Sequence, residues 1–141
     1  MTATAAAPLP LGSNPEPAAA ILAAAGQLLP HLERGERVDA AALRAAMETA
    51  FGASDATGAW DWKTAYDACE AATVLFLRKY GRALFRKAGS PAARLSALSK
   101  IANLLPTHTR RSAESQTFQQ FSTPIPLGLV AAHAAAITPA D

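Results

Sequence analysis

Apolar residues recur at helical spacing from Pro17 onward. The run that starts there is rich in alanine, the best helix former, and Pro17 suits the first turn of a helix. Because Pro30 lacks a backbone N–H, we expect it to end or kink this helix. The buried stripe is expected to consist of Ile21, Leu22, Leu28 and Leu29.

A second helix is predicted after Asp39. The carboxylate of Asp39 is expected to accept a hydrogen bond from an otherwise unpaired N–H of the first turn. Leu43, Met47 and Phe51 recur at four-residue spacing, and Gly52 supplies a C-terminal stop. The pattern therefore predicts a helix with one buried side.

Two further helices follow the turn-rich segment 52–58. The first is long, with Gly81 as its expected weak point or end. The second opens with Ser90 as cap and Pro91 at the first helical position, and Pro106 closes it. The apolar side of the long helix comprises Tyr66, Cys69, Thr73, Phe76, Leu77 and Tyr80, and that of the next helix Leu95, Leu98, Ala102 and Leu105.

The predicted fold class is mainly α, since no segment shows the alternation of a strand. Residues 1–17 are expected to be a disordered lead-in, because they hold too few large apolar side chains to offset the entropy of ordering them. Residues 18–105 form the predicted helical module. Thr123 is expected to cap a last helix that contains Leu127, Leu129, Val130 and Ile137 and ends at Thr138-Pro139.

The charge of the chain is divided unevenly between its halves. Its 141 residues, half of them hydrophobic, suit one modest core. Residues 1–70 carry four basic residues against nine acids, whereas residues 71–113 carry nine basic residues and no acid. Such a block favours contact with a phosphate backbone. It is equally typical of solvated helix faces, or of a basic half that pairs with an acidic one.

Several functional classes lack the residues that they need. Cys69 is the single cysteine, and the three histidines are scattered, so we expect no disulfide and no metal site. No serine lies in a nucleophile elbow, so no catalytic residue is assigned. With neither a secretory signal nor an apolar run of membrane-spanning length, the protein is expected to be soluble and cytoplasmic.

One motif near the end of the chain points to a family. Phe121-Ser122-Thr123-Pro124 resembles the Phe-x-Thr-Pro motif of amino-directed DNA methyltransferases, where it begins the helix before the first strand of the cofactor fold. The segment 58–68, Gly-Ala-Trp-Asp-Trp-Lys-Thr-Ala-Tyr-Asp-Ala, and the acid-free block resemble bacterial strawberry notch-like proteins. Those proteins join such a methyltransferase domain to a superfamily-two helicase, and the resemblance covers most of residues 20–141.

The resemblance implies a cofactor and its site. The cofactor is S-adenosylmethionine, and Phe121, Ser122, Thr123 and Pro124 lie beside its methionine end, where a helix N-terminus presents free N–H groups to a carboxylate. Phe121 either covers this pocket or anchors the helix in the core. Without the resemblance, Phe-Ser-Thr-Pro is equally typical of an ordinary helix start.

The resemblance also implies a longer enzyme. Residues 106–141 are expected to form a basic connector and the truncated start of a Rossmann-like domain, because the sequence has no Gly-x-Gly and no Asp/Asn-Pro-Pro-aromatic tetrapeptide. The chain is thus expected to be an inactive N-terminal fragment of an adenine-N6 DNA methyltransferase. Without the sheet, the side chains of Ile125, Leu129, Val130 and Ile137 are expected to be exposed.

DNA is the expected partner, together with the rest of the parent polypeptide. Arg110 and Arg111 on the polar connector are the first candidates for phosphate contact, followed by Arg86 and Lys87. Trp60, Trp62 and Tyr66 either stack on bases or belong to the core. The alternative functions are a non-enzymatic helical adaptor that binds DNA or protein through the 78–111 block, and a helical bundle whose charges serve solubility alone.

Overall fold

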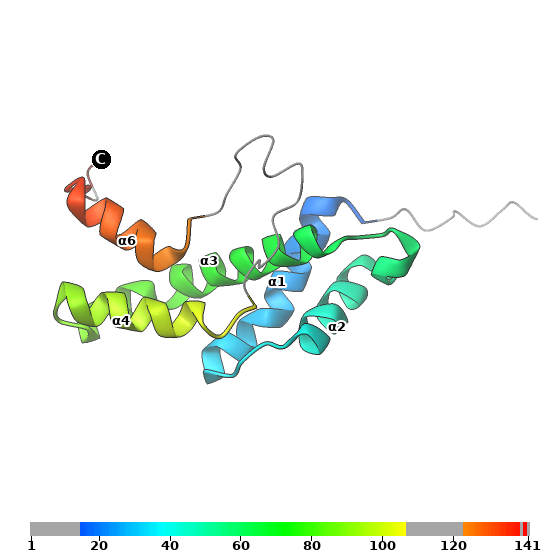
Figure 1. Cartoon of the computed structure of the whole chain (residues 1–141), viewed down its shortest axis with the longest axis horizontal. Helices are drawn as coiled ribbons and strands as arrows, with labels where there is room; N and C mark the ends of the chain where they lie inside the picture. Colours follow the sequence, from blue (N-terminus) through cyan, green and yellow to red (C-terminus); the bar gives the residue numbers. More distant parts are fainter. Residues whose placement is uncertain (1–14, 107–122, 139, 141) are drawn as a thin grey trace, which may run out of the picture.

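The computed structural model describes residues 15–106, 123–138 and 140, and in this part of the chain the protein is mainly helical with no strand (Figure 1). Helix α3 runs across the whole assembly: α1 and α2 pack together beside its first half, α4 lies along its second half, and α6 packs on α4. The elements are α1 (Pro17–Arg34), α2 (Ala40–Phe51), the short 3-10 helix η1 (Asp55–Thr57), α3 (Trp62–Lys87), α4 (Pro91–Ala102) and α6 (Ile125–Ala134).

Helix α1 does not end at Pro30, so the first of the two expected effects of this proline is not observed. It continues to Arg34, and Gly35 ends it in the left-handed conformation with φ 67°. The N–H groups of Gly35 and Glu36 close the last turn on the carbonyls of Leu32 and His31. Burial of Leu28 and Leu32 on either side of Pro30 stabilises the helix through the proline.

Alanine residues form the contact between α1 and α3. Ala24 and Ala25 on α1 are fully buried, as are Ala65, Ala68 and Ala72 on α3. This contact determines the buried side of α1. Leu28 is buried and Ile21 and Leu29 are partly buried as predicted, but the prediction is wrong for Leu22, whose exposed fraction is 56%.

The caps of α2 and α3 follow from local chemistry. The Asp39 carboxylate accepts a hydrogen bond from the Ala42 N–H at 2.8 Å, and Gly52 ends α2 with φ 71°, both as predicted. Asp61 caps α3 in the same way through the Thr64 N–H. Gly81 neither ends nor interrupts α3, which continues to Lys87 with Leu84 and Phe85 half-buried beyond the glycine.

The second half of the chain attaches through α4. Ser90 caps α4 as predicted, with its Oγ accepting from the Ala93 N–H at 3.2 Å. After α4 the chain returns to the core, where Leu105 is buried and the Leu104 carbonyl accepts a hydrogen bond from the Val38 N–H at 2.7 Å. This hydrogen bond therefore joins the segment that follows α4 to the connection between α1 and α2.

The start and end of α6 differ from the prediction. Pro124, not Thr123, occupies the cap position, and no side-chain hydrogen bond caps the helix. The helix ends at Ala134 instead of extending to Thr138, because Ala136 turns into the left-handed region with φ 53° and the Ile137 N–H closes on the Ala132 carbonyl.

The apolar side chains of α6 are only partly covered. Val130 on α6 and Ile137 just after the helix are 49% and 64% exposed, as predicted, and Leu127 on α6 is 60% exposed. Ile125 and Leu129 are half-buried instead, because α6 packs against α4. Within the described residues, none of the helices combines the length and the apolar character needed to cross a bilayer.

Candidate functional site

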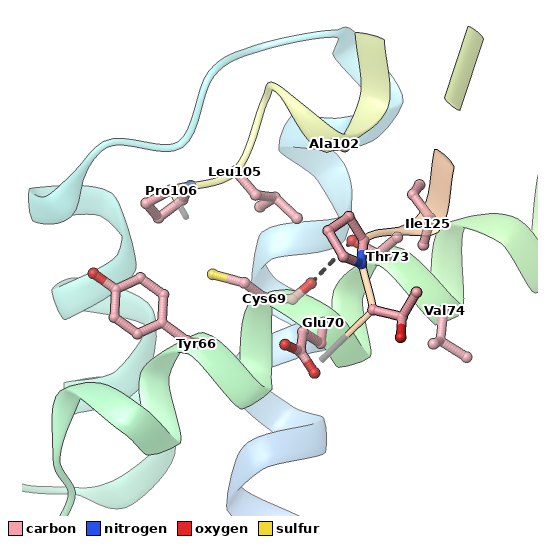
Figure 2. A pocket seen from close by; sticks show the side chains of 11 residues that line it. Tyr66, Cys69, Glu70, Thr73, Val74, Ala102, Leu105, Pro106 and Ile125 are labelled. Atoms are coloured by element: carbon pink, nitrogen blue, oxygen red, sulfur yellow. Dashed lines mark hydrogen bonds between the residues drawn. The ribbon is translucent and has the colours of Figure 1, made fainter. Parts of the chain in front are cut away.

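A pocket of about 520 Å³ lies where α3, the end of α4 and the start of α6 meet (Figure 2). One wall is Thr123, Pro124 and Ile125, so the two described residues of the Phe-Ser-Thr-Pro motif border it. The rest of the lining comes from α3 and from the segment that ends α4: Tyr66, Cys69, Glu70, Thr73, Val74, Ala102, Leu105 and Pro106. The volume is within the range of small-molecule sites.

The polar groups of the pocket are few and differ in availability. Glu70 is exposed and presents a carboxylate, and Tyr66 contributes a half-buried phenol ring. The Thr73 hydroxyl donates to the Cys69 carbonyl at 3.1 Å, so its proton is committed within α3 (Figure 2). Glu70 is therefore the charged group that a ligand meets on the α3 wall.

The start of α6 provides positive polarity, opposite to the negative charge of the Glu70 carboxylate. The Gly128 N–H closes the first turn on the Pro124 carbonyl at 3.0 Å, which leaves the earlier N–H groups without an intrahelical partner. Pro126 in the first turn has no N–H, so Ile125 and Leu127 are the donors that remain. The helix dipole adds partial positive charge at this end.

Cys69 lies in the lining but is not a nucleophile. Burial raises the pKa of its thiol to about 12. The neutral thiol is the unreactive form, and the side chain is almost completely covered. Cys69 therefore contributes an apolar surface to the pocket.

Reactivity of Cys69 is a direct check of this packing. At about pH 8, we expect the native protein to resist a thiol reagent such as iodoacetamide, while the protein in denaturant reacts as an ordinary cysteine. Because the neutral thiol is favoured only in the folded state, this contribution to stability is expected to be lost as the pH rises above 9.0, the ordinary pKa. Rapid labelling of the native thiol at pH 8 would show that the Cys69 site is open.

The basic residues of the acid-free block have different roles in the structure. Lys79 donates to the Glu33 carboxylate at 2.6 Å, and the Tyr80 hydroxyl donates to the same oxygen at 2.7 Å, which links α3 to α1. These bonds raise the pKa of Lys79 and lower that of Glu33. Arg94 donates from Nε to the carbonyls of Phe85 and Ala88 at the end of α3.

The candidate nucleic-acid residues fall in two groups. Arg86 and Lys87 are exposed in the last turn of α3. Arg110 and Arg111 lie outside the described residues, as do Phe121 and Ser122 of the cofactor motif. The sequence prediction did not single out Arg78 and Arg82, although their spacing with Arg86 places all three along one side of α3.

The tryptophans belong to the folded core. Trp60 is buried and donates its indole N–H to the Ala53 carbonyl at 2.9 Å. Trp62 packs edge-on against Trp60, and the Arg44 guanidinium lies over its ring at 5.4 Å. Of the two interpretations left open by the sequence, the structure supports the packing role for these rings.

In the part of the chain that the structure describes, no three His, Cys, Asp or Glu side chains come together in a group that could hold a metal ion. The described features define a small helical protein with an apolar pocket and a basic helix face. Comparison with known protein families, with curated proteins and with solved structures found no match for the chain.

Proposed function

We propose that the chain is the N-terminal part of an S-adenosylmethionine-dependent DNA methyltransferase of the strawberry notch-like kind, directed to adenine N6 and joined to a superfamily-two helicase. The observation that carries the proposal is the position of Thr123 and Pro124, which border a pocket of ligand size at the start of α6. The residues that line this pocket bind and orient the cofactor, and the cofactor supplies the methyl group.

The chemistry of the pocket fits the methionine end of S-adenosylmethionine. That end carries a carboxylate, an ammonium group and a sulfonium cation. The free N–H groups at the start of α6 suit the carboxylate, and Glu70 on the other wall suits a cation. The apolar lining from Ala102 and Leu105 suits the uncharged part of the ligand.

The exposed apolar side chains of α6 give a second, independent support. Leu127 and Val130 lie on α6, which has no Asp, Glu, Lys or Arg, and Ile137 follows the end of this helix; all three side chains are exposed. An apolar surface of this kind is typical of a helix with a further packing partner, which is the place that the resemblance assigns to it against a sheet.

Binding of S-adenosylmethionine to the 141-residue chain tests the proposal. We expect weak affinity, with a dissociation constant on the order of 1 mM. Glu70→Gln is expected to weaken binding roughly fivefold, or about 1 kcal/mol, because it removes the charge that faces the cation. Glu48→Gln, on α2 and away from the pocket, is the matched control.

The motif itself is tested by Thr123→Ala and Pro124→Ala in the same titration. Weaker binding in either variant, with the circular dichroism spectrum unchanged, supports a cofactor role for the α6 start. Wild-type affinity in both would remove the motif from the site. Absence of any S-adenosylmethionine binding at millimolar ligand would contradict the proposal as a whole.

A further inference from the structure

The second half of α3 carries a continuous basic surface toward solvent. Arg78, Arg82 and Arg86 are exposed and follow one another at four-residue spacing, which places them along one side of the helix. Lys87 extends this surface around the last turn. We call these four residues the basic face of α3.

The basic face has no compensating acid in the described part of the chain. Among the described residues, the Lys and Arg side chains in ion pairs are others: Arg34, Arg44, Lys63 and Lys79 pair with acids of the first half. None of the four side chains of the basic face has an ion-pair or hydrogen-bond partner among the described residues. The idea that the acidic half simply neutralises the basic half therefore fails for this face.

We propose that the basic face of α3 binds the phosphate backbone of double-stranded DNA without reading its sequence. The proposal rests on the proposed DNA-directed function and assigns it a contact surface. Four helical residues advance by about 6 Å, and the phosphates of one DNA strand are spaced by about 3.4 Å along the duplex axis, so successive arginines reach nearby phosphates. The guanidinium fork suits a phosphate better than an ammonium group does.

Duplex DNA fits this face better than single strands or a membrane surface. Single-strand sites stack bases on exposed aromatic rings, whereas every aromatic residue in the described part of the chain is buried or half-buried. Phe85, the aromatic residue within this turn of the helix, has Arg94 over its ring at 5.5 Å. A membrane-surface helix buries its apolar side in lipid, but α3 packs against α1 and, in its second half, against α4.

Fluorescence anisotropy with a duplex of about 20 base pairs tests the proposal on the 141-residue chain. We expect binding that weakens steeply between about 50 and 200 mM salt. In the triple variant Arg78→Gln, Arg82→Gln, Arg86→Gln, the slope of log affinity against log salt is expected to fall by about 3. Over this fourfold range of salt, a slope smaller by about 3 means that the affinity falls about 60-fold less than in the wild type. Glutamine is a good helix former, so the fold is retained.

The matched control removes the same charge elsewhere. Arg34→Gln, Arg37→Gln, Lys63→Gln also lowers the net charge by three and is expected to keep the wild-type slope within about 1. An equal decrease of the slope in both triple variants would show that only the net charge matters. An unchanged slope in the Arg78, Arg82, Arg86 variant would show that the basic face does not contact DNA. Either result overturns the proposal.

Two further probes separate the possible partners. A single strand of the same sequence is expected to bind more weakly than the duplex, and vesicles with anionic lipid are expected not to bind through these arginines. Preference for either probe would overturn the duplex assignment. Because S-adenosylmethionine binding is measured without DNA, its failure and the failure of this proposal are distinguishable.

Discussion

Replacing Leu28 with alanine is expected to lower the free energy of unfolding by about 2–5 kcal/mol. Leu28 is fully buried in α1 and belongs to the cluster that joins α1, α2 and α3. The substitution removes apolar surface from the core and leaves a cavity, because packed helices relax only partly. A small domain is stable by only about 5–15 kcal/mol, so the loss is large. Urea unfolding followed by circular dichroism measures it.

Leu22→Ala is the matched control for this prediction. It makes the same chemical change in the same helix, at a side chain that is 56% exposed. We expect the free energy of unfolding to change by no more than about 0.5 kcal/mol, since surface substitutions away from special contacts have small effects. Equal losses in Leu22→Ala and Leu28→Ala would mean that α1 packs in a different orientation.

Enlarging Ala68 to leucine is expected to lower the free energy of unfolding by about 1–3 kcal/mol. Ala68 is fully buried on α3, where it belongs to the row of alanines that contacts α1. The added methyl groups have no free volume there, so α1 and α3 are forced apart or the new side chain leaves its preferred rotamer. Few large side chains are fully buried among the residues that the structure describes, so this close contact contributes a substantial part of their packing.

Ala83→Leu provides the comparison for Ala68→Leu. Ala83 lies on the same helix but is exposed, so leucine there is expected to change the free energy of unfolding by no more than about 0.5 kcal/mol. Thermal unfolding of both variants measures the difference. A stabilising effect of Ala68→Leu would show that the space between α1 and α3 is not filled.

Local sequence chemistry predicted the caps of α2 and α4 but not the start and end of α6. Asp39, Gly52 and Ser90 act within a few residues of themselves, and all three perform the predicted capping roles. The orientation of α1 depends on α3, which presents alanines to it, so the prediction from large apolar residues alone was wrong for Leu22. Pro30 does not end α1, because Leu28 and Leu32 are buried on either side of it.

The candidate site was harder to predict from the sequence, because its residues come together only in the tertiary structure. The motif at Thr123 and Pro124 was visible in the sequence, but nothing near it indicated that Glu70 and Cys69 of α3 would face it across a pocket. The spacing of Arg78, Arg82 and Arg86 in the sequence was sufficient to predict the basic face of α3. The structural roles of Lys79 and Arg94 could not be predicted, because their partners come from other turns and helices.

We propose that the start of α6 binds the carboxylate of S-adenosylmethionine. The most direct measurement is a comparison of amide chemical shifts of the 141-residue chain with S-adenosylmethionine and with methylthioadenosine, which lacks the amino-acid part. We predict that the Ile125 and Leu127 amides shift with S-adenosylmethionine and stay in place with methylthioadenosine. Equal shifts with both ligands, or none with S-adenosylmethionine, would contradict the claim.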